Sequence, residues 1–260
     1  MADDFRLRNE IGVHGKRWHT MHNCYFADPE VALPFIDTIS HEILNFKPSV
    51  VADLGGGNGF ILSELAKRHP ETSIRYINVD ISPEQLRECK YDDITSLQTS
   101  AEDITRGSLV KDDSSLMFIM RSLLHYLGYY GVTPFLKHLR AQMKPGETMI
   151  HQTACFESYE DADCANHLYA LMRTPKWYPT VTSLTQTLIE TGWQVLYCKP
   201  APNLCLKSPE LAERYDLSAE DITHIRKEIG RKYNRPMVFI SDDSNFTAFL
   251  HYRIFTCRAG

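Results

Sequence analysis

The sequence has no apolar run that approaches the roughly 20 residues needed to span a membrane. Residues 1–8 are rich in charge, and no apolar segment of the signal-peptide kind follows them. We therefore expect a cytoplasmic protein with no membrane partner.

A strong excess of charge of one sign is also missing. The formal net charge is −5 at pH 7, with 28 Lys and Arg against 33 Asp and Glu. The cations that do cluster, in residues 226–235, fall near the end of a predicted helix, where they suit the negative end of its dipole. This balance does not favour nucleic acid as a partner.

The cysteines lack the spacing of a disulfide framework or a zinc cluster. There are 7, an odd number, and no two of them form a C-x-x-C pair. His19 and His22 stand at i, i+3, but no carboxylate is placed beside them to complete a metal site. We expect reduced thiols and no bound metal.

The sequence is rich in short apolar runs that alternate with amphipathic stretches. The 260 residues are 43% hydrophobic and 23% charged, which is ordinary for one sizeable globular domain. Strands are predicted at 50–54, 73–80, 95–100, 115–120, 147–155, 193–198 and 246–257. Helices are predicted between most of them, so the chain should form a mostly parallel α/β sheet with helices on both faces.

Some segments do not fit this alternation. Residues 1–46, with an amphipathic helix near 29–44, are predicted to form an N-terminal helical lid on a main domain of residues 47–260. Helical insertions are expected at about 156–180 and 203–245, with Ser218 starting a helix in the second of them.

The most informative pattern follows the first strand. Asp53 ends an apolar run, and Gly55, Gly57 and Gly59 then form a tight turn into a helix, at the edge of the sheet where α/β folds bind ligands. The dinucleotide fingerprint G-x-G-x-x-G fails, because Phe60 or Leu62 stands where its last glycine should be. The P-loop pattern fails as well, because no Gly-Lys-Ser/Thr follows.

The turn resembles the first motif of the class I S-adenosylmethionine-dependent methyltransferases, Asp-x-Gly-x-Gly-x-Gly, with Asp53, Gly55, Gly57 and Gly59 at its fixed positions. The resemblance extends by motif order over about residues 48–200 and 246–257. It implies a Rossmann-like, mostly parallel seven-stranded sheet and S-adenosylmethionine as cofactor. It also implies methyl transfer to an O or N nucleophile of a small molecule, with S and C left open.

Acids after the next two strands take the order that the resemblance requires. Asp80, followed by Ile81, is assigned to the ribose hydroxyls, and Glu102 and Asp103 to the adenine. A helix-capping acid remains the alternative for Asp80, and a solvated turn for the later pair. Asp53 either orients the glycine turn or helps to hold the methionine ammonium.

The segment after the fourth strand, from Arg121 to Tyr126, resembles Arg-Asn-x-Leu-His of small-molecule methyltransferases, with Ser122 in place of Asn. Arg121 is assigned to the cofactor site. His125 is the candidate general base, because imidazole titrates near neutral pH, and structural packing is the alternative. Magnesium-dependent relatives carry acids where Arg121 stands, which also argues against a metal.

Aromatic residues supply the candidate substrate contacts: Trp18, His22, Tyr25, Tyr126 and Tyr130. Two other functions stay open at this stage. One is a nucleotide-cofactor oxidoreductase, and the other is a module that binds S-adenosylmethionine without turnover. The acceptor and the oligomeric state, a homodimer included, do not follow from the sequence.

Overall fold

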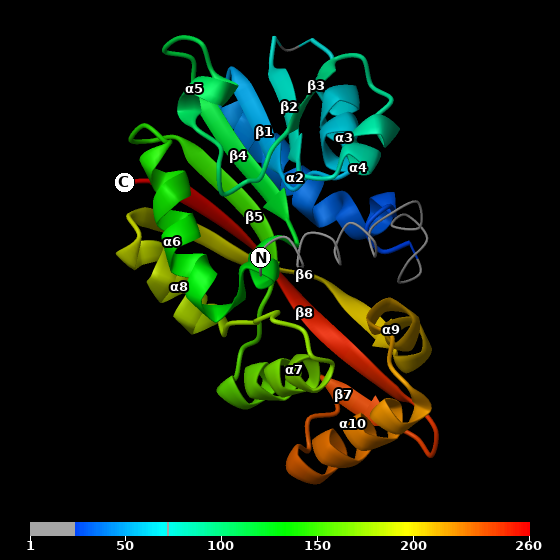
Figure 1. Ribbon diagram of the computed structural model, residues 1–260. Coiled ribbons are helices and arrows are strands. Elements are labelled where there is room, and N and C mark those ends of the chain that lie inside the picture. The colour runs from blue at the N-terminus through cyan, green and yellow to red at the C-terminus, as the bar shows by residue number, and fades with distance from the viewer. Residues whose placement is uncertain (1–23, 72) are drawn as a thin grey trace.

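One eight-stranded sheet runs through the molecule (Figure 1). The structure is a computed structural model that describes residues 24–71 and 73–260. The strands are β1 Val50–Leu54, β2 Arg75–Asp80, β3 Ile94–Gln98, β4 Leu116–Arg121, β5 Thr148–Ala154, β6 Trp193–Lys207, β7 Phe239–Ser241 and β8 Phe246–Ala259. They are ordered β3-β2-β1-β4-β5-β8-β6, and the short β7 pairs with β8.

The first five strands are parallel, and β8 is antiparallel to both β5 and β6. This confirms the predicted Rossmann-like, mostly parallel sheet. Strand order reverses between β1 and β4, so a crevice for a ligand is expected at the carboxyl ends of these two strands.

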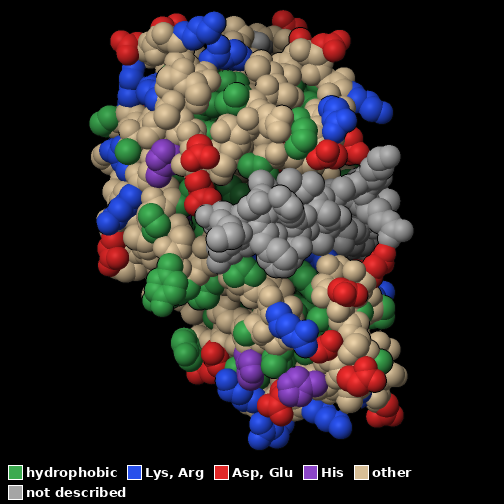
Figure 2. Space-filling model, in the orientation of Figure 1, with side chains coloured by type: hydrophobic (Ala, Val, Ile, Leu, Met, Phe, Trp, Pro, Cys, Tyr) green, Lys and Arg blue, Asp and Glu red, His purple; other side chains and the backbone are tan. Residues whose placement is uncertain are grey.

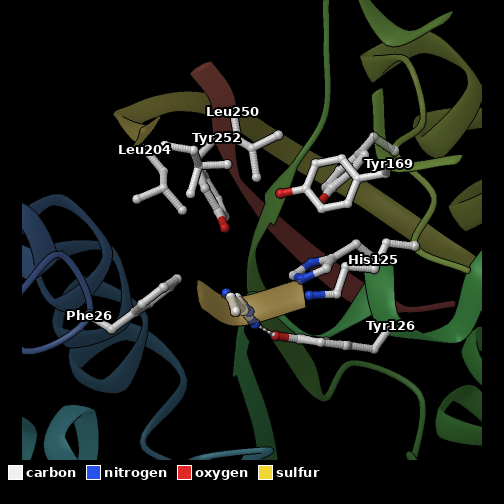
Figure 3. A pocket seen from close by; sticks show the side chains of 11 residues that line it. Phe26, His125, Tyr126, Tyr169, Leu204, Leu250 and Tyr252 are labelled. Atoms are coloured by element: carbon white, nitrogen blue, oxygen red, sulfur yellow. Dashed lines mark hydrogen bonds between the residues drawn. The ribbon is translucent and has the colours of Figure 1, made fainter. Parts of the chain in front are cut away.

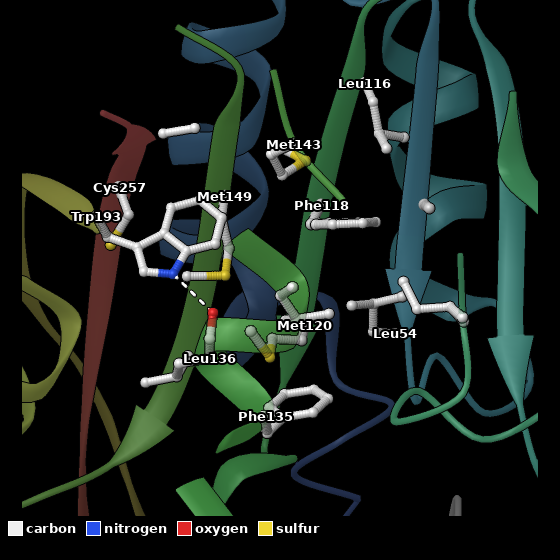
Figure 4. Packing of buried hydrophobic residues seen from close by; sticks show 14 of the residues in the cluster. Leu54, Leu116, Phe118, Met120, Phe135, Leu136, Met143, Met149, Trp193 and Cys257 are labelled. Carbon is white, nitrogen blue, oxygen red and sulfur yellow. Dashed lines mark hydrogen bonds between the residues drawn. The ribbon is translucent and has the colours of Figure 1, made fainter. Parts of the chain in front are cut away.

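Helices cover both faces of the sheet because its central strands are apolar on both sides. The helical elements are α2 Pro29–Phe46, α3 Phe60–Arg68, α4 Pro83–Glu88, α5 Arg106–Leu109, η1 Leu124–Leu127, α6 Gly128–Ala141, α7 Tyr159–Leu171, α8 Val181–Glu190, α9 Ser208–Tyr215 and α10 Ala219–Lys232. Along β4, Met117 and Ile119 belong to the core shared with α2 and α3, whereas Phe118 and Met120 belong to the core shared with α6 and α8. In the core shared with α6 and α8, the Trp193 indole N–H donates to the Leu136 carbonyl at 3.1 Å (Figure 4).

Local capping chemistry sets the helix starts. The Ser82 hydroxyl accepts from the Gln85 N–H at 3.3 Å, and Pro83 occupies the first turn of α4. Ser218 and Asp221 form a reciprocal capping box at the start of α10, as their spacing predicts.

The helix predicted within the lid at 1–46 forms a layer of the core instead. In α2, the side chains of Phe35, Ile36 and Ile39 are buried against Val51 and Ile119 of the sheet. The reason is its apolar stripe, which is broad enough to seal one face of the sheet next to α3.

The insertions at 156–180 and 203–245 build a separate apolar core, in addition to the two cores on the faces of the main sheet. Strand β6 runs to Lys207 rather than ending near residue 198, and it pairs with β8 beyond the end of β5. Helices α7, α9 and α10 and strand β7 pack around this extension (Figure 1). None of the described helices is both long and apolar enough to cross a membrane.

Charges of both signs are interspersed over the surface visible in Figure 2. On and after α10, three cations pair with nearby acids: Arg231 with Glu228, Lys232 with Asp163, and Arg235 with Asp161. These pairs fit the interpretation of the 226–235 cluster as a solvated helix end.

Candidate functional site

The glycine turn lies directly after β1, at the point where strand order reverses. Gly55, Gly57 and Gly59 have φ angles of +71°, +57° and +75°. Gly56 is constrained by space, because a Cβ there would lie 2.2 Å from Asn78 Oδ1 and 2.8 Å from Asp53 Oδ2. The main chain is therefore pressed onto the ends of β1 and β2.

Asp80 ties the end of β2 to this turn. Its Oδ2 accepts from the Gly57 N–H at 2.9 Å, and its Oδ1 accepts from the Ser82 N–H at 2.8 Å. Burial raises the pKa of Asp80, and the backbone donors oppose that shift. A carboxylate has about four acceptor positions, so Asp80 can still accept a hydrogen bond from a hydroxyl group.

Asp53 is an almost fully buried acid, 1% exposed, at the end of β1. Burial raises its pKa to about 7, the charge of Asp80 adds to the shift, and Arg121 opposes it. Among the described residues, Asp53 Oδ1 has no hydrogen-bond partner. A buried carboxylate with an unused oxygen favours a cationic ligand nearby.

These features fit S-adenosylmethionine, which carries ammonium and sulfonium charges as well as a ribose. Asp53 supplies negative charge, Asp80 supplies acceptors, and the turn presents main chain without side chains. Ile81 is 37% exposed beside Asp80, and Glu102 and Asp103 lie exposed in the turn after β3.

Arg121 links the end of β4 to the chain before α2. Its guanidinium donates to the carbonyls of Phe26 at 3.2 Å and Tyr25 at 3.4 Å. It also lies over both rings, 5.5 Å and 5.4 Å from their centroids. Arg121 therefore holds Phe26 in place, and its charge also acts on Asp53.

Ser122 connects the same strand end to the core built by the insertions. It has a left-handed backbone, with φ +62°, and its N–H donates to the Gln152 carbonyl at 2.8 Å. Its hydroxyl donates to the Tyr252 hydroxyl at 2.9 Å. This bond joins β4 to β8, 130 residues further along the chain.

A small cavity lies beside this junction, within the core built by the insertions (Figure 3). Its wall is mainly aromatic and aliphatic, with two cations. The lining residues are Phe26, His125, Tyr126, Tyr169, Lys176, Tyr178, Leu204, Leu206, Arg214, Leu250 and Tyr252. Phe26 belongs to this wall and its carbonyl accepts from Arg121, so these two residues connect the cavity to the end of β4.

His125 lies in the wall of the cavity and is 6% exposed. Its ring packs 4.2 Å from the Tyr126 ring and stacks on Tyr178 at 5.5 Å between centroids. Its carbonyl accepts from the Trp177 N–H at 3.1 Å. Backbone and ring contacts thus fix the imidazole against the cavity.

The predicted substrate residues separate into three groups. Tyr126 lines the cavity. Tyr25 is buried outside the lining, with its hydroxyl donating to the Pro202 carbonyl at 2.5 Å, and Tyr130 is 88% exposed on the outer side of α6. Trp18 and His22 lie outside the described residues.

Sequence reasoning missed several residues of the site. Asn78 is fully buried and donates from Nδ2 to the Gly57 carbonyl at 2.8 Å. An amide side chain inside an apolar strand could have indicated this role, because a buried amide needs hydrogen-bond partners. Tyr169, Tyr178 and Tyr252 gave no such signal, since only tertiary packing brings them to His125.

The described residues contain no group of three or more His, Cys, Asp or Glu side chains that could hold a metal ion. The predicted lack of a metal remains a prediction.

Residues 51–146 match the family described as "Methyltransferase domain". No curated protein matches the chain by sequence.

Solved structures share the fold at low sequence identity. The YcgJ protein of Bacillus subtilis is 13% identical with a TM-score of 0.67, over 89% of this chain and 99% of that one. A putative methyltransferase from Bacillus halodurans C-125 is 12% identical with a TM-score of 0.65, over 85% and 98%. The 1,6-didemethyltoxoflavin-N1-methyltransferase of Burkholderia thailandensis, solved with 1,6-didemethyltoxoflavin and S-adenosylhomocysteine, is 15% identical with a TM-score of 0.57, over 99% and 89%.

Proposed function

We propose that the chain is a class I S-adenosylmethionine-dependent methyltransferase that methylates an oxygen or nitrogen atom of a small molecule, and the match of residues 51–146 to a methyltransferase domain supports this. Sulfur and carbon acceptors stay open. The observation that carries the proposal is the buried Asp53, whose Oδ1 has no partner among the described residues, beside the glycine turn and Asp80 at the carboxyl edge of the sheet. Arg121 and Phe26 connect this edge to the aromatic wall at His125.

In this proposal, the carboxyl edge of the sheet binds the cofactor. Asp80 accepts from the ribose hydroxyls, with Ile81 beside it, and the turn at Gly55, Gly57 and Gly59 lies along the methionine part. Asp53 balances its positive charge. Glu102 and Asp103 are proposed to meet the adenine, and Arg121 to fix the wall between cofactor and acceptor.

Catalysis then rests on placement and exclusion of water. S-adenosylmethionine, when bound, supplies an electrophilic methyl group. The rings around His125 would keep water from an acceptor placed against them. Where the acceptor atom carries a proton that must leave, the His125 imidazole accepts it.

The proposal is tested with S-adenosylmethionine carrying a labelled methyl group and a panel of phenols, aromatic amines and N-heterocycles. The Burkholderia thailandensis neighbour, solved with 1,6-didemethyltoxoflavin, supports the choice of heterocycles. We expect label to appear in at least one acceptor class. Tight cofactor binding with no transfer to any acceptor would instead favour a module without turnover.

A further inference from the structure

Two buried side chains end at the same point below the glycine turn. Asp53 on β1 and Asn78 on β2 are register partners in adjacent parallel strands. A Cβ at Gly56 would lie 2.2 Å from Asn78 Oδ1 and 2.8 Å from Asp53 Oδ2, so both side chains press against this glycine. Asp53 is 1% exposed and Asn78 is 0% exposed, which removes both groups from bulk water.

The Asn78 amide turns its oxygen toward Gly56 and Asp53. Its Nδ2 donates to the Gly57 carbonyl at 2.8 Å, and a carbonyl needs a donor, so this bond fixes the orientation of the amide. Among the described residues, neither Asn78 Oδ1 nor Asp53 Oδ1 has a hydrogen-bond partner. Two buried acceptors beside each other with no donor between them are unfavourable.

A proton on Asp53 would supply the missing donor. A neutral carboxyl group has one O–H, which can donate to Asn78 Oδ1, whereas a carboxylate only accepts hydrogen bonds. Asp80, the other acid of this edge, already accepts from the N–H groups of Gly57 and Ser82, and such bonds favour its ionised form. Asp53 is therefore the acid of this edge that gains most from a proton.

The surroundings of Asp53 also favour its neutral form. Among the described residues, the charges that act on it are those of Asp80 at the end of β2, which disfavours ionisation, and Arg121 at the end of β4, which favours it. Helices α2 and α3 contribute apolar side chains to the core on this face of the sheet. Burial is the largest influence, and together these groups raise the pKa of Asp53 to about 7.

We propose that Asp53 and Asn78 share a proton in the cofactor-free protein, and that binding of the cofactor releases this proton. The inference rests on the proposed function and concerns the regulation of the same site by pH. The ammonium group of the cofactor brings positive charge to the Asp53 carboxyl group, which favours its ionised form. The O–H bond of the carboxyl group then breaks, the proton passes to the solvent, and the carboxylate balances the ammonium charge. Because the two events are linked, a lower pH weakens cofactor binding.

The test is calorimetric titration with S-adenosylhomocysteine at pH 6 and pH 8, in buffers that differ in their enthalpy of ionisation. The dependence of the measured heat on the buffer gives the number of protons released per site. We expect roughly 0.9 protons at pH 6, one unit below the pKa of Asp53, and far fewer at pH 8. Below pH 6 the affinity should fall by about tenfold for each unit of pH, because one proton competes with the ligand.

Asp53→Asn keeps the size of the side chain but cannot take up the proton. The buffer-dependent heat at pH 6 should be lost in this variant, and its Kd should change little below that pH. Protons exchanged by the ammonium group of the ligand are the same for both proteins, so the difference between them belongs to Asp53. Asp243→Asn, which removes an exposed acid, should release as many protons as the unaltered protein.

Infrared difference spectroscopy gives a second measurement, which does not require a variant to bind the ligand. With isotopically labelled aspartate, the cofactor-free protein at pH 6 should show the C=O stretch of a protonated carboxyl group. S-adenosylhomocysteine should remove this band from the unaltered protein. Asp53→Asn should lack the band before any ligand is added.

A binding heat at pH 6 that does not depend on the buffer would overturn the inference. Unchanged proton release in Asp53→Asn would overturn it as well, as would the absence of the protonated band from the cofactor-free protein. Binding of S-adenosylhomocysteine without proton release would leave the proposed function intact. Failure of the unaltered protein to bind S-adenosylhomocysteine at either pH would instead count against the proposed function.

Discussion

At the scale of single residues, Asp53 is a buried acid whose ionised form destabilises the folded protein. The acid is buried at the end of β1, and burial raises its pKa to about 7 from the ordinary 3.8. The folded chain therefore binds more protons than the unfolded chain between these two pH values. Asp53 therefore lowers the free energy of unfolding as the pH rises from about 4 toward 7, and the loss is complete above pH 7.

Asp53→Asn should stabilise the cofactor-free protein at pH 8 by a few degrees in Tm, roughly 2–4 °C for each kcal/mol in a chain of this size. The gain should be smaller at pH 5, because Asp53 is then already protonated in the folded state. Thermal unfolding at the two pH values checks this. Asp243→Asn, an exposed acid, is the control, and an equal loss of Tm at both pH values would contradict the account.

His125→Gln should lower kcat by about 10²-fold or more where the acceptor must lose a proton, since general bases contribute about 10²–10⁴. The Kd of S-adenosylmethionine should not change, and the fall of kcat at low pH should disappear. Steady-state kinetics against pH measure both. His224→Gln, on the exposed side of α10, should behave as the unaltered protein. An unchanged kcat for such an acceptor would assign His125 to packing alone.

At the scale of elements, α2 illustrates the difference between a lid and a core layer. Phe35→Ala should lower the free energy of unfolding by about 3–5 kcal/mol, as is typical for a buried phenylalanine. Leu33→Ala is the matched control, because Leu33 is 41% exposed on the same helix. Denaturant unfolding distinguishes a core layer from a lid. Loss of activity at unchanged stability in Phe35→Ala would indicate that α2 acts as a lid.

Elements with local signals were predictable. Ser82 and Ser218 fixed helix starts, and the apolar run before Asp53 fixed β1. The length of β6 was not, because Pro200 and Pro202 disfavour a strand beyond residue 198. An edge strand accommodates prolines, and β6 does so with a register shift between Ala201 and Leu204.

At the scale of the whole molecule, the proposed cofactor edge follows from sequence and the cavity at His125 does not. The acids and glycines of the edge lie within a few residues of strands that the pattern predicts. The cavity depends on contacts such as Ser122 with Tyr252 and Tyr25 with Pro202, which are 130 and 177 residues apart. Composition and periodicity carry no information on such pairs, so Lys176, Tyr178 and Arg214 emerged only from the fold.

The central claim is that the crevice at Asp53 and Asp80 binds the cofactor, and calorimetric titration with S-adenosylhomocysteine tests it most directly. We predict one binding site per chain in the unaltered protein. Binding should be at least about tenfold weaker in Asp80→Ala, because charged hydrogen bonds contribute about 1.5–3 kcal/mol. Asp243→Ala should bind as the unaltered protein does. Absence of binding, or equal affinity in Asp80→Ala and the unaltered protein, would contradict the account.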